Sequence, residues 1–247
     1  MDFERSAQID QAQVQQPLFQ NEALELARVL QKYSVDELVQ LMNISQELAQ
    51  INKARFETFS PEPDADRVQP AMFAYQGSVF QEIEVENLNS DQLAFAQKHL
   101  RIISGLYGIL RPLDGIQPYR LEMSTKLQIG EHENLYQFWR NKLTHCLQET
   151  LEELKEDTVV NLASKEYYQA IDFKALNARV ITPVFKNLKH NKYKVIGVLA
   201  KKARGKMTRE IIRQKINKPD QLTGIPLGGY RYSAEYSGKN QLVFLKD

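Results

Sequence analysis

The chain has 247 residues, of which 43% are hydrophobic and 26% are charged, and its 32 basic and 31 acidic side chains give a formal net charge of +1. This composition predicts a single globular domain over residues 1–247 and excludes a chain that is disordered overall. No apolar run approaches the roughly 18 to 20 residues of a membrane span, and Met1 to Gln20 lacks the features of a secretory signal. The single cysteine, Cys146, excludes an intramolecular disulfide, so we expect a cytoplasmic protein with no membrane partner.

The first third of the chain is expected to be a peripheral segment followed by helices. Residues 1–20 are rich in glutamine and show little periodicity, so we expect them to dock loosely. Helical signals begin at about Asn21, and Ser34 and Glu37 form a capping box that opens a further helix. Five apolar residues fall on one stripe of this predicted helix: Leu38, Leu41, Met42, Leu48 and Ile51. The pattern therefore predicts one helix from the capping box to about residue 51.

The middle of the chain mixes short elements with one long helix. Prolines and acids at 59–66 predict a loop, the apolar run 71–75 favours a strand, and Ser90 is expected to cap a helix. Two glycines in the segment 101–112 indicate either a turn or a strand that crosses another segment closely. An amphipathic helix is predicted around 135–154, with Trp139 and Cys146 in the core.

Strands and a basic connection dominate the C-terminal third. A buried strand at 158–163 runs into a short helix at 165–168, and strands at 178–185 and 193–200 are expected to form a hairpin. A basic connection then leads to a helix from about Met207 to Ile216, which Pro219 ends, and residues 242–245 form a last strand. This mixture predicts an α+β domain with a mixed sheet flanked by helices.

Charge is distributed unevenly along the chain. Residues 1–90 carry 15 acidic and 6 basic side chains, a net charge of −9, whereas residues 182–218 carry 12 basic side chains and one acidic, a net charge of +11. The clustered excess favours a face for a polyanion over the alternative that the basic residues pair with the acidic N-terminal half. The segment Ala200-Lys-Lys-Ala-Arg-Gly-Lys206 is its centre, and its cations suit phosphate oxygens.

Motifs for other chemistry are weak. The basic segment is not a Walker A loop, no dinucleotide-binding glycine pattern occurs, and the four histidines have no metal-ligand spacing, so the sequence predicts no cofactor and no metal site. Ser164, Lys165 and Glu166 follow a predicted strand and support a second hypothesis, an enzyme acting on a nucleotide or another phosphorylated small molecule. The structural alternative for Ser164 is a helix cap. An iron-binding protein is a third hypothesis, for which no ligand cluster is found.

Several ordered blocks resemble a known family. They run from about residue 20 to the C-terminus: 95–114, 117–123, 135–139, 160–164, 201–205 and 221–224. Together they closely resemble the bacterial YaaA family of peroxide stress proteins. The resemblance implies a single α+β domain of unusual topology, a positively charged cleft, a helix–hairpin–helix-like element, binding of double-stranded DNA, and a role in limiting DNA damage when peroxide meets intracellular iron. It implies neither a catalytic residue nor an obligate protein partner.

The resemblance also assigns residues to the DNA-binding cleft. Its basic side chains are expected to be Lys201, Lys202, Arg204, Lys206 and Arg209, with Arg101, Arg111 and Arg120 as neighbours. The hairpin is expected at Gly105-Leu-Tyr-Gly108, and Tyr107 and Tyr119 are candidates either for stacking on bases or for the core. Members of the family open with an apolar strand and Ser-Pro-Ala-Lys-Thr, whereas this chain begins Met1-Asp-Phe-Glu4. We therefore expect a start assigned late or a shortened copy, with a sheet edge left unpaired.

Overall fold

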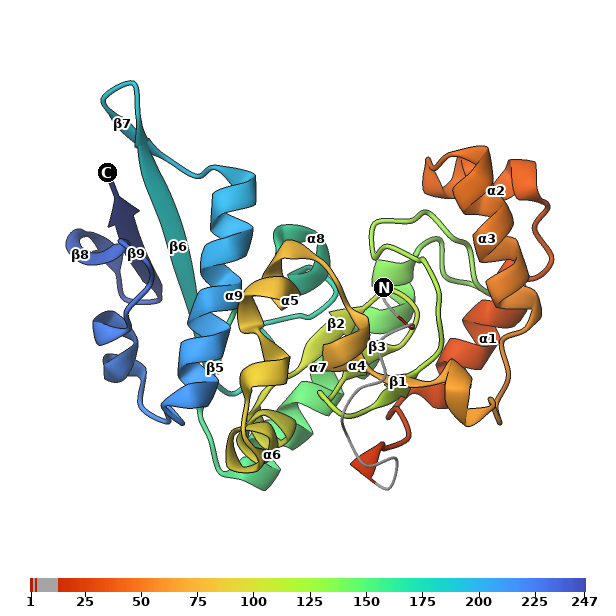
Figure 1. The fold of residues 1–247 in the computed structure, drawn as a ribbon, viewed down its shortest axis with the longest axis horizontal. Coiled ribbons are helices and arrows are strands. Elements are labelled where there is room, and N and C mark those ends of the chain that lie inside the picture. The colour runs from red at the N-terminus through yellow and green to blue at the C-terminus, as the bar shows by residue number, and fades with distance from the viewer. Residues whose placement is uncertain (2, 4–12) are drawn as a thin grey trace. The chain divides into compact units, whose positions relative to one another are not determined.

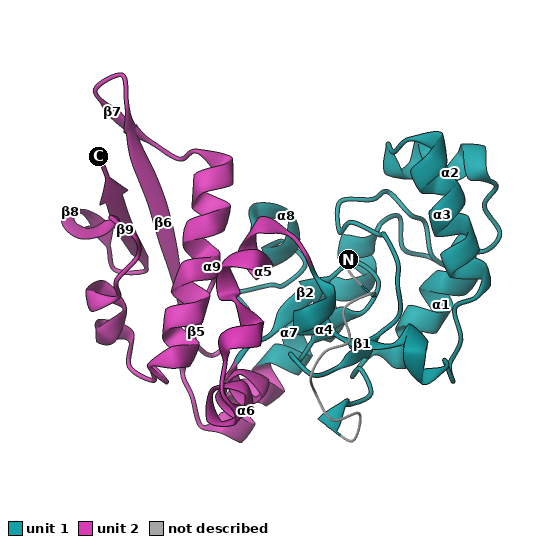
Figure 2. Cartoon of the chain, viewed as in Figure 1, with its two compact units in different colours: residues 1–75, 100–147, 164–175 teal, residues 76–99, 148–163, 176–247 magenta. Residues whose placement is uncertain are grey.

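The computed structural model describes Met1, Phe3 and residues 13–247, and these residues form two compact units (Figures 1 and 2). Unit 1 comprises residues 1–75, 100–147 and 164–175, and unit 2 comprises residues 76–99, 148–163 and 176–247. Each unit is assembled from three separate stretches of sequence, so no linker marks the division. The predicted class, a mixed sheet flanked by helices, is confirmed.

Unit 1 is mainly helical, with two very short strand pairings, β1 with β4 and β2 with β3. Its elements are α1 (Gln20–Leu30), α2 (Val35–Met42), α3 (Gln46–Glu57), a 3₁₀ turn (Ala65–Arg67), β1 (Gln69–Pro70), α4 (Ala71–Ala74), β2 (Ile102–Ser104), β3 (Gly108–Leu110), β4 (Gly115–Ile116), the first part of α7 (Leu135–Leu154) and α8 (Lys165–Tyr168). Half of the predicted peripheral segment, residues 2 and 4–12, lies outside the described residues. Within the described part, Gln15 pairs with Asp114 and is therefore docked.

Unit 2 is a mixed sheet covered by one long helix. Its elements are α5 (Ser78–Ile83), a 3₁₀ turn (Val85–Asn87), α6 (Ser90–His99), the end of α7, β5 (Thr158–Val160), β6 (Arg179–Lys189), β7 (Lys192–Lys194), α9 (Gly197–Arg213), a 3₁₀ turn (Pro219–Gly224), β8 (Arg231–Gly238) and β9 (Gln241–Lys246). The strand order is β5-β6-β9-β8, and β7 pairs with the far end of β6. β6 is parallel to β5 and β9, whereas β8 and β7 are antiparallel to their partners.

The core of unit 2 lies between the sheet and α9. Phe185 on β6 and Phe244 on β9 stack with ring centroids 5.5 Å apart, and Ala203 and Met207 of α9 pack in the same buried cluster. Figure 1 shows α9 running alongside β6. The alternation along β6 places one side of the strand in this core and leaves the other partly exposed.

The predicted helix from Ser34 to about residue 51 is two helices. The capping box at Ser34 and Glu37 is confirmed, but Asn43 adopts a left-handed conformation with φ of 50°, and the Ser45 hydroxyl then accepts from the Leu48 N–H to cap α3. The prediction of one helix was wrong because Met42 and Leu48, which were placed on one apolar stripe, lie on either side of this turn. The result is a pair of helices, α2 and α3, joined by three residues.

Two other boundaries differ from prediction. The run 71–75 forms the short helix α4 and not a strand, because the Asp114 and Pro112 carbonyls accept the N–H groups of Ala71 and Met72 at 2.9 and 3.0 Å. α6 is capped by the side chain of Asn89, which accepts from the Gln92 N–H at 2.9 Å, so Ser90 is the first helical residue. No helix of the described residues has both the length and the apolarity needed to cross a membrane.

A hydroxyl cluster lies in the core of unit 1. The Tyr119 hydroxyl is 2.6 Å from the Ser104 Oγ and 2.6 Å from the Tyr75 hydroxyl, and the Tyr107 hydroxyl accepts from the Gln117 N–H at 3.0 Å. Of the two alternatives for Tyr119, the core position is the correct one. Burial raises the pKa of Tyr119 well above the ordinary value of 10.0, and it also raises the pKa of Tyr75.

These tyrosines predict alkaline sensitivity. Because the pKa of Tyr119 is higher in the folded chain than in the unfolded chain, its contribution to stability is complete below pH 10 and is lost as the pH rises beyond it. We expect the free energy of unfolding to fall steeply above about pH 10. Urea titrations at a series of alkaline pH values measure this, and tyrosinate absorbance should report the buried tyrosines only as the protein unfolds. Ionisation of all 11 tyrosines in the still-folded protein would contradict the prediction.

Candidate nucleic-acid interface

The predicted basic connection is part of a helix. The five basic residues predicted to line the cleft, Lys201, Lys202, Arg204, Lys206 and Arg209, all lie on α9, which begins at Gly197. The second strand of the predicted hairpin is correspondingly short, because it ends at Lys194 and not at Ala200. The β-branched residues before Ala200 favoured a strand, but the Ala-, Lys- and Arg-rich sequence that follows favours a helix.

α9 is packed on two sides, which limits where its cations can point. Ala200, Ala203 and Met207 face the sheet. Gly205 lies against α5, where a Cβ atom would be 2.2 Å from the Val79 carbonyl oxygen. Glycine is required at this position because the two helices approach closely. Basic side chains near Gly205 therefore lie beside the carboxylates of α5.

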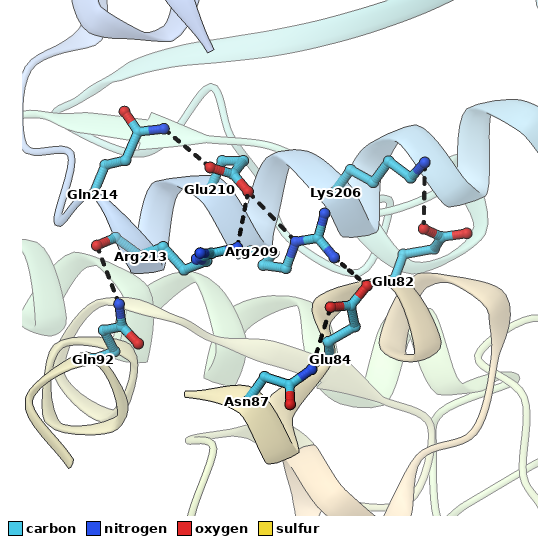
Figure 3. A network of polar contacts seen from close by, with 9 residues as sticks. All are labelled: Glu82, Glu84, Asn87, Gln92, Lys206, Arg209, Glu210, Arg213 and Gln214. Carbon is cyan, nitrogen blue, oxygen red and sulfur yellow. Dashed lines mark hydrogen bonds and ion pairs between the residues drawn. The ribbon is translucent and has the colours of Figure 1, made fainter. Parts of the chain in front are cut away.

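These carboxylates pair with several α9 cations (Figure 3). Glu82 lies 3.7 Å from the Lys202 Nζ and 3.6 Å from the Lys206 Nζ, and Glu84 pairs with Arg209. The side chain of Lys202 is 52% exposed and that of Arg209 only 18%. Phosphate oxygens can therefore replace Glu82 as the partner of Lys202 and Lys206. Arg209 is held in place by Glu84.

The C-terminal half of α9 continues the polar network. Glu210 lies within ion-pair distance of Arg209 and Arg213 and accepts from the Gln214 amide at 3.0 Å, and the Gln92 amide of α6 donates to the Arg213 carbonyl at 3.3 Å (Figure 3). Lys215 pairs with Asp91 at 3.3 Å. This network attaches the end of α9 to α6 and neutralises the cations there.

Four lysines near the other end of α9 have no acidic partner in the part of the chain that the structure describes. Lys189, Lys192 and Lys194 lie on the β6–β7 hairpin, and Lys201 lies on the first turns of α9. All four are exposed, and none has an ion pair with any carboxylate of the described residues. The three hairpin lysines were counted in the basic excess of the sequence but were not assigned as contacts, because no motif marks them.

The backbone adds to the positive potential at this end. The N-cap of α9 is Ile196, whose side chain accepts no hydrogen bond, so the first N–H groups of the helix have no side-chain acceptor at the cap. Such N–H groups and the helix dipole favour an anion at this position. The exposed apolar side chains of Leu188, Val195 and Val198 belong to the same stretch of chain.

The predicted hairpin at Gly105-Leu-Tyr-Gly108 is interior. It joins the antiparallel strands β2 and β3, so this segment is a β-hairpin and not the turn of a helix–hairpin–helix. Tyr107 is 0% exposed, and a Cβ at Gly105 would lie 2.3 Å from the Leu121 carbonyl oxygen. Gly108 has φ of +67° and lies against Trp139. These three residues pack the core of unit 1, so we do not retain them as contacts.

The three predicted arginines of unit 1 have local partners. Arg111 pairs with the buried carboxylate of Asp114 at 2.8 Å. Arg101 donates from Nη1 to the Leu100 carbonyl at 3.0 Å. Arg120, which is exposed, pairs with Glu122 at 2.7 Å. Arg111 and Arg101 are thus engaged with the fold of unit 1, and Arg120 is the one of the three whose contact lies fully at the surface.

The Arg111–Asp114 pair is expected to be a major determinant of stability. The Asp114 carboxylate is fully buried and accepts from both the backbone N–H and the guanidinium of Arg111; burial raises its pKa, and Arg111 opposes that shift. Asp114→Ala is expected to lower the free energy of unfolding by about 3 kcal/mol, because Arg111 loses its partner. Glu122→Ala breaks an exposed pair and should cost less than about 1 kcal/mol. Urea denaturation compares them, and equal losses would contradict the prediction.

The alternative site around Ser164 is not assembled as a catalytic group. Ser164 is the N-cap of α8 but its side chain makes no cap hydrogen bond, and Lys165 is exposed. The Glu166 carboxylate accepts from the Ser124 hydroxyl at 2.9 Å and from its N–H at 3.3 Å. Glu166 thus holds the loop around Ser124 in place. Among the described residues, no three His, Cys, Asp or Glu side chains meet as a metal site.

Comparison with known proteins gives matches over nearly the whole chain. The family model for peroxide stress protein YaaA matches residues 1–236. A UPF0246 protein of Idiomarina loihiensis is 44% identical over 246 residues, which cover 100% of this chain and 95% of that protein. A UPF0246 protein of Ruegeria pomeroyi is 42% identical over 231 residues, which cover 94% of this chain and 90% of that protein. The similarity therefore concerns entire chains and not one motif.

Proposed function

Because the chain belongs to the peroxide stress protein YaaA family, we propose that it binds duplex DNA and so limits the damage that peroxide and intracellular iron cause to DNA. The proposed contact surface is the hairpin-helix surface, which we define as the β6–β7 hairpin and the first turns of α9. It differs from the predicted cleft because the packing of unit 2 leaves different cations available.

One observation carries the proposal. Lys189, Lys192, Lys194 and Lys201 are exposed, lie close along the chain, and have no acidic partner among the described residues. Lysines that are not neutralised by their own protein can replace the counterions of DNA phosphates. The N–H groups at the start of α9 offer a further phosphate contact.

Two further cations extend the surface along α9. Lys202 and Lys206 share the Glu82 carboxylate at distances too long for direct hydrogen bonds, so each can turn to a phosphate. Arg209 is not included, because it is mostly buried against Glu84. The hairpin-helix surface thus offers phosphate contacts and no pattern of base-reading side chains, which predicts binding with little sequence preference.

A salt titration of binding tests the proposed function. The logarithm of the binding constant for a labelled duplex should fall linearly with the logarithm of the salt concentration. The slope should be near −0.9 for each phosphate contact, or about −3 to −4 if the four lysines contribute. Absent or salt-independent binding would reject the proposal. In addition, Lys201→Ala combined with Lys202→Ala should weaken binding similarly on unrelated duplex sequences. A strongly sequence-dependent loss would place these side chains on base edges.

A further inference from the structure

The sheet of unit 2 has a second face that α9 does not cover. Phe185 and Phe244 point toward α9 and are buried, so their neighbours Lys186 and Leu245, which pair across β6 and β9, point to the opposite side. Lys186 and Leu245 are partly exposed. We call the part of this side formed by β7, β8 and the ends of β6 and β9 the open face.

Two tyrosines and a lysine meet on the open face. Tyr193 of β7 and Tyr236 of β8 pack edge to face, with ring centroids 5.7 Å apart. The Lys186 Nζ lies 5.4 Å from the centroid of the Tyr236 ring. Tyr236 is 44% exposed, and Tyr193 is held in place by a hydrogen bond of 2.6 Å from its hydroxyl to the Asp247 carboxylate. Aromatic rings are thus fixed at the surface beside a cation.

A groove of about 400 Å³ continues from Tyr193 across β8 and β9. Its lining includes Arg231, Tyr232 and Ser233 beside Leu245 and Asp247. The groove combines two tyrosine rings and the Leu245 side chain with a guanidinium, a hydroxyl and the Asp247 carboxylate. Its volume lies within the range of sites for small ligands.

We propose that the open face binds single-stranded DNA by stacking unpaired bases on Tyr193 and Tyr236. Exposed aromatic rings on a sheet stack bases that are not already stacked, and nearby cations bind the phosphates that link them. Arg231 and Lys186 supply those cations. The bases of an intact duplex are already stacked on each other and cannot occupy this face.

This inference is independent of the duplex proposal. The open face and α9 lie on opposite sides of the same sheet, so the two sites use different side chains of β6. The cations of this site, Lys186 and Arg231, outnumber its one carboxylate, Asp247, and this excess of positive charge favours a polyanion over a protein partner.

Binding of labelled oligo(dT) to the full chain tests the inference. Tyr236→Ala should weaken binding about 10-fold, because stacking on one aromatic ring contributes on the order of 1.4 kcal/mol. Tyr236→Phe should bind like the unmodified chain, because it keeps the ring. Tyr33→Ala, which removes a partly exposed tyrosine of unit 1, is the matched control and should have no effect.

Photocrosslinking locates the contact. An oligonucleotide carrying 5-iodouracil should crosslink to peptides that contain Tyr193 or Tyr236. Failure of the unmodified chain to bind oligo(dT), an equal loss in Tyr33→Ala, or crosslinks confined to other peptides would each overturn the inference. Duplex affinity should be unchanged in Tyr236→Ala. Binding of oligo(dT) without binding of duplex would reject the proposed function alone, and the reverse would reject this inference alone.

Discussion

Replacement of Lys189, Lys192, Lys194 and Lys201 by alanine in one chain is expected to reduce duplex affinity by about 100-fold or more at moderate salt, about 0.1 M. If two of the four lysines contact phosphates at any time, and each charged hydrogen bond contributes about 1.5 kcal/mol, the loss is about 3 kcal/mol. The salt dependence should become shallower at the same time, since fewer counterions are released. Fluorescence anisotropy with a labelled duplex measures both quantities.

A control with the same change in charge separates contact from net charge. Lys32, Lys126, Lys165 and Lys174 are exposed lysines of unit 1, and their replacement by alanine also removes four positive charges. This control should retain affinity within a few-fold, because charges that make no phosphate contact are largely screened at moderate salt. Equal losses in both variants would mean that binding depends on overall charge and would remove the hairpin-helix surface from the proposal.

Gly205→Ala is the second change with a large expected effect. A Cβ at this position would lie 2.2 Å from the Val79 carbonyl oxygen and 2.8 Å from the Glu82 Cβ, so α5 must move away from α9. Overpacking costs roughly 1–3 kcal/mol and exceeds the gain of up to about 1 kcal/mol in helix propensity. We expect a net loss of about 2 kcal/mol, equivalent to a fall of about 4–8 °C in Tm.

Gly197→Ala is the matched control for this change. Gly197 is the first residue of α9, and a Cβ added there would meet no atom within 4 Å, so the substitution should leave Tm unchanged or raise it slightly. Thermal unfolding of the two variants measures the difference. A Gly205→Ala chain as stable as Gly197→Ala would show that the contact between α5 and α9 relaxes at little cost.

Local signals in the sequence predicted the elements that depend on neighbouring residues. The capping box at Ser34 depends on four consecutive residues and is confirmed, as is the amphipathic helix with Trp139 in the core. Gly105 and Gly108 were predicted to mark either a turn or a closely crossing strand, and they lie at the turn between β2 and β3, where close backbone approach requires glycine. The resemblance implied that this segment contacts DNA, whereas it packs in the core of unit 1. Its burial depends on distant residues that pack around it.

The candidate site was harder to predict because partners are set by the tertiary structure. The +11 segment was evident, but the identity of its neutralised members depends on Glu82 and Glu84, more than 100 residues earlier in the chain. The same holds for α4, whose helical start depends on carbonyls of residues 112 and 114. The division into two units was not predicted, because both are assembled from non-adjacent segments.

The position of β9 bears on how the protein is made. β9 is the last strand along the chain, yet it lies between β6 and β8 in the sheet. During synthesis, β6 and β8 therefore emerge from the ribosome before the strand that joins them, and the aromatic core that includes Phe244 cannot close until β9 has emerged. Newly made chains should reach a protease-resistant unit 2 only after residues 241–246 have left the ribosome, so nascent chains arrested before residue 241 are expected to be degraded readily.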